Sequence, residues 1–133
     1  MLKPTLFLLK ICLMCGLTAC AGNSQAALET TPATRGEALF VQGGCQACHA
    51  FQPGVDVPNI GPNLAGAAAL GAQGLADPAY NGQAETVTDY LRESILKPEV
   101  YVTPGFEPIM PAYAAVISDE DLAELVKYLE ALP

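Results

Sequence analysis

Cys45-Gln46-Ala47-Cys48-His49 is the stretch of sequence that decides how this chain folds. Two cysteines separated by two residues and followed directly by a histidine are typical of the attachment site of a covalent haem. The two thiols form thioether bonds to the haem vinyl groups, and the adjacent imidazole binds the iron. His49 is the single histidine of the chain, so no other imidazole competes for that place. The motif therefore predicts one haem c, attached through Cys45 and Cys48 and ligated by His49.

A pair of cysteines two residues apart has two other common uses, as a redox-active dithiol and as half of a zinc site. A redox dithiol needs a βαβ context, and no segment of any length has the periodicity of a strand. A zinc site needs further cysteine or histidine ligands, of which the processed chain would have too few. Both interpretations are much weaker than a haem site.

Residues 1–19 have the character of a lipoprotein-type signal peptide. Lys3 and Lys10 bracket an early apolar piece, and a hydrophobic run follows over 11–17. That run is shorter than the roughly 20 apolar residues that a membrane-spanning helix needs. It leads into Leu17-Thr18-Ala19-Cys20, which resembles the box of bacterial lipoproteins that is cut before a lipid-bearing cysteine.

This resemblance implies that Cys20 carries the lipid. The protein would then be exported and anchored on the outer face of the bacterial cytoplasmic membrane, on the periplasmic side, by several acyl chains. An ordinary cleaved signal and an uncleaved anchor are the alternatives. Residues 20–33 are small, polar and without pattern, so we expect a lipidated N-terminus and flexible tether there, followed by one domain over 34–133.

Processing also simplifies the cysteines and the charge. Cys12 and Cys15 would leave with the signal, so that Cys45 and Cys48 remain for the haem and no disulfide framework is expected. The chain has 14 acidic and 6 basic residues. Loss of the two signal lysines leaves four basic residues, and hence a net charge of −10 before the haem propionates are counted. Such a surface repels nucleic acid and favours redox partners with basic docking patches.

The remaining pattern predicts an all-α domain, with helices packed around the haem. Thr34 is expected to cap a first helix that ends at Gly43, and a second helix is expected over 85–96. Ser118 is expected to cap a final helix whose first turn is acidic. Residues 65–84 are rich in alanine and glycine; they suggest a short helix near 65–70, and their role is open.

Met110 is the candidate for the second axial ligand. Met1 and Met14 would be removed with the signal, which leaves Met110 as the sole methionine. It lies in the segment 105–111, in a loop stiffened by prolines that can present a thioether at a fixed distance. A methionine ligand raises the reduction potential of a haem. The alternative is that Met110 only fills a gap in the core.

Together these features resemble a class I c-type cytochrome with one haem, over Thr34 to Leu132. The segment Gly61-Pro62-Asn63-Leu64 and the pair Met110-Pro111 carry the resemblance besides the haem motif. It implies that the Pro62 carbonyl accepts a hydrogen bond from His49, which would fix the tautomer of the imidazole. It also implies that Leu64 lines the haem face.

The same resemblance implies three further placements. Gly36 should face Tyr128 where the first and last helices cross, with Phe40 packed nearby. Tyr101 is a plausible partner of a haem propionate, although a surface or core tyrosine is an equal alternative.

Two protein ligands would leave the iron no open position for a substrate, which favours electron transfer over catalysis. The segment DYLRESILKPEVYVTPGFEPIMPAY, residues 89–113, is similar to monohaem cytochrome domains of respiratory complexes. Examples are subunit II of caa3-type oxidases and the monohaem lipoprotein subunit of alternative complex III, a quinol-oxidising assembly. Lipid anchoring favours the latter. The alternatives are a freestanding anchored carrier that serves an oxidase or a photosynthetic reaction centre, and a haem sensor or enzyme in which Met110 is displaced.

Overall fold

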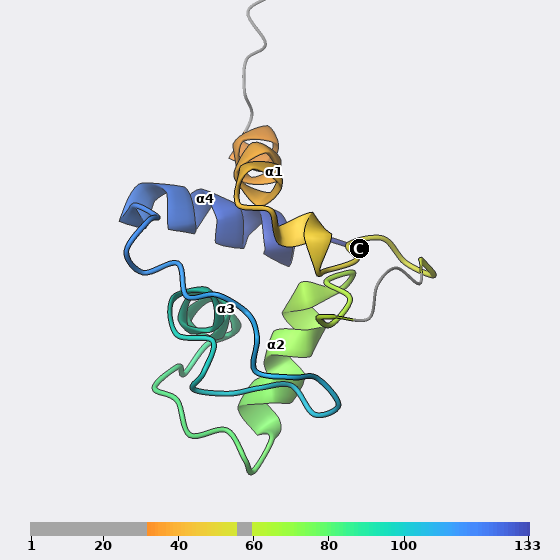
Figure 1. The fold of residues 1–133 in the computed structure, drawn as a ribbon, viewed down its shortest axis with the longest axis vertical. Coiled ribbons are helices and arrows are strands. Elements are labelled where there is room, and N and C mark those ends of the chain that lie inside the picture. Colours follow the sequence, from red (N-terminus) through yellow and green to blue (C-terminus); the bar gives the residue numbers. More distant parts are fainter. Residues whose placement is uncertain (1–31, 56–59) are drawn as a thin grey trace, which may run out of the picture.

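The computed structural model describes residues 32–55 and 60–133, and within these ranges the fold is all-α, as predicted. The elements are α1 (Pro32–Gln42), a short 3-10 helix η1 (Cys45–Ala47), α2 (Ala67–Ala76), α3 (Val87–Leu96) and α4 (Asp119–Glu130), and no strand occurs among them (Figure 1). The predicted signal, the lipid site at Cys20 and most of the predicted tether lie outside the described residues.

The helix α1 begins three residues earlier than a cap at Thr34 predicts, so Thr34 lies inside it instead of capping it. Proline is favoured in the first turn of a helix, because the N–H that it lacks would have no partner there and its φ angle is already helical. Pro32 therefore extends the helix upstream of the expected capping box. At the other end, the Gly43 N–H donates to the Leu39 carbonyl at 2.8 Å and closes the last turn.

The first and last helices cross at Gly36, as the resemblance implied (Figure 1). A Cβ atom on Gly36 would lie 2.3 Å from Cβ of Tyr128 and 2.4 Å from the carbonyl oxygen of Glu124, so only glycine permits this approach. The Phe40 side chain is 1% exposed, and its ring centroid lies 5.8 Å from that of Tyr128. This crossing fixes where α1 delivers the cysteines that follow it.

The final helix has the predicted cap. The Ser118 hydroxyl accepts a hydrogen bond from the Asp121 N–H at 3.1 Å, and three acidic residues occupy the first turn. Its apolar face supplies the centre of the core, through Leu122, Leu125, Val126 and Leu129.

The segment rich in alanine and glycine forms a longer helix than predicted, because α2 runs from Ala67 to Ala76. Its small residues admit the Tyr90 ring of α3. A Cβ atom on Gly74 would lie 2.4 Å from the Tyr90 hydroxyl oxygen, and one on Gly71 would lie 3.3 Å from the Tyr90 ring. Glycine costs roughly 0.5–1 kcal/mol in a helix. Here the close packing of α2 on α3 offsets that cost.

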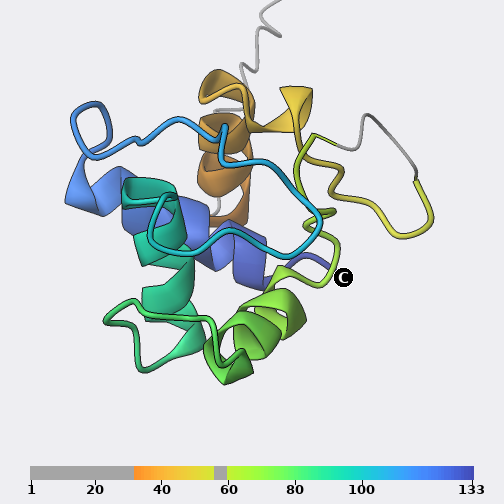
Figure 2. The same ribbon diagram turned by 60° about the horizontal axis from the view of Figure 1, so that its bottom comes forward.

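Residues 97–118 form a long loop that leads from α3 back to α4 and crosses one face of the domain (Figure 2). The predicted end of the second helix holds, because α3 ends at Leu96, just before Lys97 and Pro98; its start lies two residues later than predicted, at Val87, because Thr86 caps it. The N–H of Tyr113 donates to the Ile95 carbonyl at 3.1 Å and ties the loop to α3. Within the described ranges, no helix combines the length and the apolar character that a bilayer crossing requires.

Candidate functional site

A cavity of about 640 Å³ lies between α2, α3, α4, the haem-motif segment and the long loop. This volume is within the range of about 300–1,000 Å³ typical of cofactor sites. Its walls are mainly apolar, and the core side chains that line it are Phe40, Ala67, Leu91, Ile95, Leu125 and Leu129. Every helix of the domain contributes, so the cavity occupies the place of a core rather than of a surface groove.

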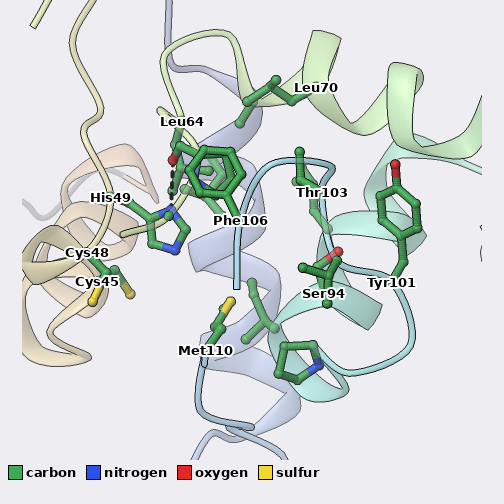
Figure 3. Close-up of a pocket in the computed structure, with 18 of the residues that line it drawn as sticks. Cys45, Cys48, His49, Leu64, Leu70, Ser94, Tyr101, Thr103, Phe106 and Met110 are labelled. Atoms are coloured by element: carbon green, nitrogen blue, oxygen red, sulfur yellow. Dashed lines mark hydrogen bonds between the residues drawn. The ribbon is translucent and has the colours of Figure 1, made fainter. Parts of the chain in front are cut away.

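All the site residues predicted within the described part of the chain line this one cavity. They are Cys45, Cys48, His49, Pro62, Leu64, Tyr101 and Met110. Figure 3 shows the two cysteine sulfurs beside His49, and the sulfur of Met110 directed into the space that the imidazole also faces. The fold thus brings the haem motif and Met110, which lie about 60 residues apart in the sequence, to one cavity.

The hydrogen bond of His49 determines which ring nitrogen is available to a metal. Nδ1 of His49 lies 2.8 Å from the carbonyl oxygen of Pro62. Because a carbonyl oxygen can only accept, Nδ1 carries the proton and donates it (Figure 3). Nε2 therefore keeps its lone pair, which is the form of histidine that ligates a metal.

Gly61 allows the backbone to lie directly against the imidazole ring of His49. A Cβ atom on Gly61 would lie 2.6 Å from Cε1 and 2.8 Å from Nδ1 of His49, too close for any other residue. The Gly61 N–H donates to the Cys48 carbonyl at 3.0 Å, and the Leu64 N–H donates to the Ala50 carbonyl at 2.7 Å. The Gly61–Leu64 segment is thus paired with the haem motif itself.

Cys45 and Cys48 are half-buried thiols that form no disulfide. The turn of η1 places them on the cavity side, since Gly44 adopts a positive φ of 71° just before it. Burial raises the pKa of the Cys45 thiol. Two reduced thiols at the edge of an apolar cavity, next to an imidazole with a free nitrogen, match the groups that attach a haem c.

A protein-family model described as cytochrome c oxidase, cbb3-type, subunit III matches residues 31–129. The chain belongs to this family. No curated protein sequence matches it significantly.

Membership makes the chain a c-type cytochrome with covalently bound haem c, whose work is electron transfer rather than catalysis. Cytochrome c domains of this type are typically exported to the periplasmic side of the membrane. The donor set fits the group, because the cavity offers an imidazole nitrogen, a thioether sulfur, two thiols and apolar walls.

The Tyr101 hydroxyl of the cytochrome has a protein partner that the sequence did not indicate. It donates to Oδ2 of Asp77 at 2.7 Å, across 24 positions of sequence. Burial, together with this hydrogen bond, raises the pKa of Tyr101 to about 12. The Ala79 N–H and the Tyr101 hydroxyl lower the pKa of the Asp77 carboxyl. Tyr101 therefore lines the haem cavity while its hydroxyl is bound to a carboxylate.

Sequence reasoning also missed several polar residues that line the cavity of the cytochrome. They include Ser94, Thr103 and Tyr113, which carry hydroxyls, and Asp77, Glu99 and Glu107, which carry carboxylates. No lysine or arginine is among the described residues that line it. A lone serine or threonine in a loop carries no signal of this role. The acidic excess of the chain was visible, but its presence at the cavity was not.

Proposed function

We propose that the cytochrome binds its haem through thioethers at Cys45 and Cys48 and through axial bonds from His49 and Met110. The observation that carries the proposal is the hydrogen bond from Nδ1 of His49 to the Pro62 carbonyl, which leaves Nε2 as the metal-binding nitrogen. The thioether of Met110 lines the same cavity and points into it (Figure 3). Pro62, Leu64 and Tyr101 would form part of the haem environment.

With both axial positions taken by the protein, a substrate would find no free position on the iron. The haem supplies a one-electron couple, and the residues around it orient the ligands and exclude water. The apolar walls from α2, α3 and α4 support this role, because apolar side chains reorganise little when the charge of the iron changes. The function is then single-electron transfer without a bound substrate.

The ligand assignment is tested by the reduction potential of a Met110→Ala variant. Loss of a methionine ligand should lower the potential, because the thioether favours ferrous iron. Val116→Ala is the matched control, since Val116 lies in the same loop, is 78% exposed and does not line the cavity. A Met110→Ala potential equal to that of the control would remove Met110 as a ligand.

We further propose that the cytochrome is tethered by a lipid at Cys20 and works on the outer face of the cytoplasmic membrane. The pattern of residues 1–19 supports this proposal. In that setting it would carry electrons as a subunit of a quinol-oxidising complex of the alternative complex III type. Glu99 and Glu107 line the cavity and are exposed, and their negative charge favours a partner with a basic docking patch.

A second candidate role is delivery of electrons to a terminal oxidase, either as a subunit or as a freestanding anchored carrier. The description of the matching family, which names an oxidase subunit, favours it. Gentle purification from membranes, followed by identification of co-purifying subunits, separates the two roles. Quinol-oxidising subunits would support the first, and oxidase subunits or no stable partner would support the second. A Cys20→Ala variant that stays on the membrane would contradict the lipid anchor.

A further inference from the structure

Tyr113 joins the loop that carries Met110 to two other parts of the domain. Its hydroxyl donates to the Gly43 carbonyl at 2.7 Å, across 70 positions of sequence. Its backbone N–H donates to the Ile95 carbonyl in α3 at 3.1 Å. One residue, three positions after Met110, thus connects the methionine loop both to the end of α1 and to α3.

The Gly43 end of this bridge belongs to the haem-attachment segment. Gly43 closes α1 two residues before Cys45, and a Cβ atom on it would lie 3.4 Å from Sγ of Cys45 and 3.8 Å from Cε1 of Tyr113. The tyrosine ring therefore lies against the segment that carries the two cysteines. The loop that carries Met110 and the segment that carries the haem motif are therefore joined directly, by the hydrogen bond of Tyr113.

Nearer to Met110, the loop is held by short-range contacts. The Ile109 N–H donates to the Glu107 carbonyl at 2.9 Å, which shapes the turn but does not connect it to a helix. Ile109 itself is 63% exposed, and Pro111 and Ala112 are exposed as well. Tyr113 is half-buried and lines the cavity. It is therefore the nearest firm attachment on the C-terminal side of the methionine.

We propose that Tyr113 is a positioning residue that keeps Met110 on the iron, by binding the methionine loop to the haem-attachment segment through its hydroxyl. The inference rests on the proposed ligation of the iron by His49 and Met110. Opening of the loop must break the bond to Gly43 or distort it, so the hydroxyl shifts the equilibrium toward the closed loop.

The test is a titration of the oxidised, full-length holoprotein with imidazole, which binds the iron when Met110 leaves. Ligand exchange is followed through the weak long-wavelength absorption band that reports methionine–iron ligation in class I cytochromes. Tyr113→Phe keeps the ring and removes the hydroxyl. Its apparent imidazole affinity should rise about three- to tenfold, which at 1.4 kcal/mol per factor of ten is about 0.7–1.4 kcal/mol.

Tyr80→Phe is the matched control. It also removes a hydroxyl that is hydrogen-bonded, in this case to Glu93, but Tyr80 does not line the cavity. The control should lower the stability of the fold without changing the imidazole affinity. If Tyr113→Phe loses stability as the control does and binds imidazole like the wild type, Tyr113 is only structural and the proposal fails. If the wild type lacks the methionine band, the ligand assignment fails instead.

A second measurement needs no variant. The amide of Tyr113 is bound to the Ile95 carbonyl, so its hydrogen exchange reports opening of the loop. Saturation of the wild-type protein with imidazole should speed exchange at this amide relative to amides inside α4. Equal exchange with and without imidazole would show that Met110 can leave while Tyr113 stays in place, which overturns the proposal.

Discussion

Replacement of Gly61 by alanine is predicted to raise the reduction potential by disturbing His49. The new Cβ atom would lie 2.6 Å from Cε1 of the imidazole, whereas ordinary contact begins near 3.4 Å. The ring must therefore move by about 0.8 Å, the difference between these distances. The backbone cannot yield easily, because the Gly61 N–H is bound to Cys48 and the next carbonyl to His49.

A displacement of that size removes the 2.8 Å hydrogen bond between Nδ1 and the Pro62 carbonyl. With His49 bound to the iron as proposed, that bond would make the imidazole a stronger donor and stabilise ferric iron, so its loss would favour the ferrous state. If the bond stabilises the oxidised form by about 1 kcal/mol more than the reduced form, its loss raises the potential by about 40 mV. The conversion uses about 59 mV for each tenfold change in the equilibrium constant of a one-electron couple.

The assay is an optical redox titration of the purified holoprotein, with Gly54→Ala as control. Gly54 is exposed, and a Cβ atom added to it would meet nothing within 4 Å. Its φ of 68° gives the control backbone strain without contact with the imidazole. The control should keep the wild-type potential. A Gly61→Ala potential equal to that of the control, or lower, would refute the reasoning about the hydrogen bond.

Three further predictions concern stability. Gly36→Ala should destabilise the holoprotein by about 3 kcal/mol in denaturant unfolding, because its Cβ would overlap Tyr128 and the Glu124 carbonyl; an unchanged midpoint would contradict the packing of α1 on α4. Gly74→Ala should lower the free energy of unfolding by about 1 kcal/mol more in the wild-type protein than in a Tyr90→Leu variant, because its Cβ would meet the Tyr90 ring. A double-mutant cycle without coupling between the two positions would disprove that contact. The fold raises the pKa of Tyr101 to about 12, so the protonated hydroxyl stabilises the fold below pH 10 and this contribution is lost as the pH rises from 10 to about 12. In the Tyr101→Phe variant, the free energy of unfolding should therefore fall less steeply over this pH range than in the wild type.

The sequence predicted those elements whose signals are local. The start of the last helix was predicted correctly, from the Ser118 cap, the acidic residues that follow it and the spacing of the apolar residues. By contrast, α2 has no strong apolar stripe, since its small residues matter through the α3 side chains that they admit, above all the Tyr90 ring. The predicted start of α1 was wrong, because the preference of Pro32 for the first turn of a helix prevails over the capping pattern at Thr34.

The candidate site divides in the same way. The haem motif and Met110 were visible because residues 34–133 contain a single histidine and a single methionine. All of the predicted site residues that the structure describes line one cavity. The bonds from Tyr101 to Asp77 and from Tyr113 to Gly43 were not visible, because they join residues that only the tertiary fold brings together. Long-range contacts of single polar side chains leave no periodic signal in one sequence.

The central claim, that His49 and Met110 fill both axial positions of the haem, is tested most directly by the absorption spectrum of the wild-type holoprotein. The account predicts a weak long-wavelength methionine–iron band in the oxidised protein and no ready binding of carbon monoxide to the reduced haem. An oxidised protein without that band, whose reduced form binds carbon monoxide readily, would contradict the account and leave a haem with an open iron.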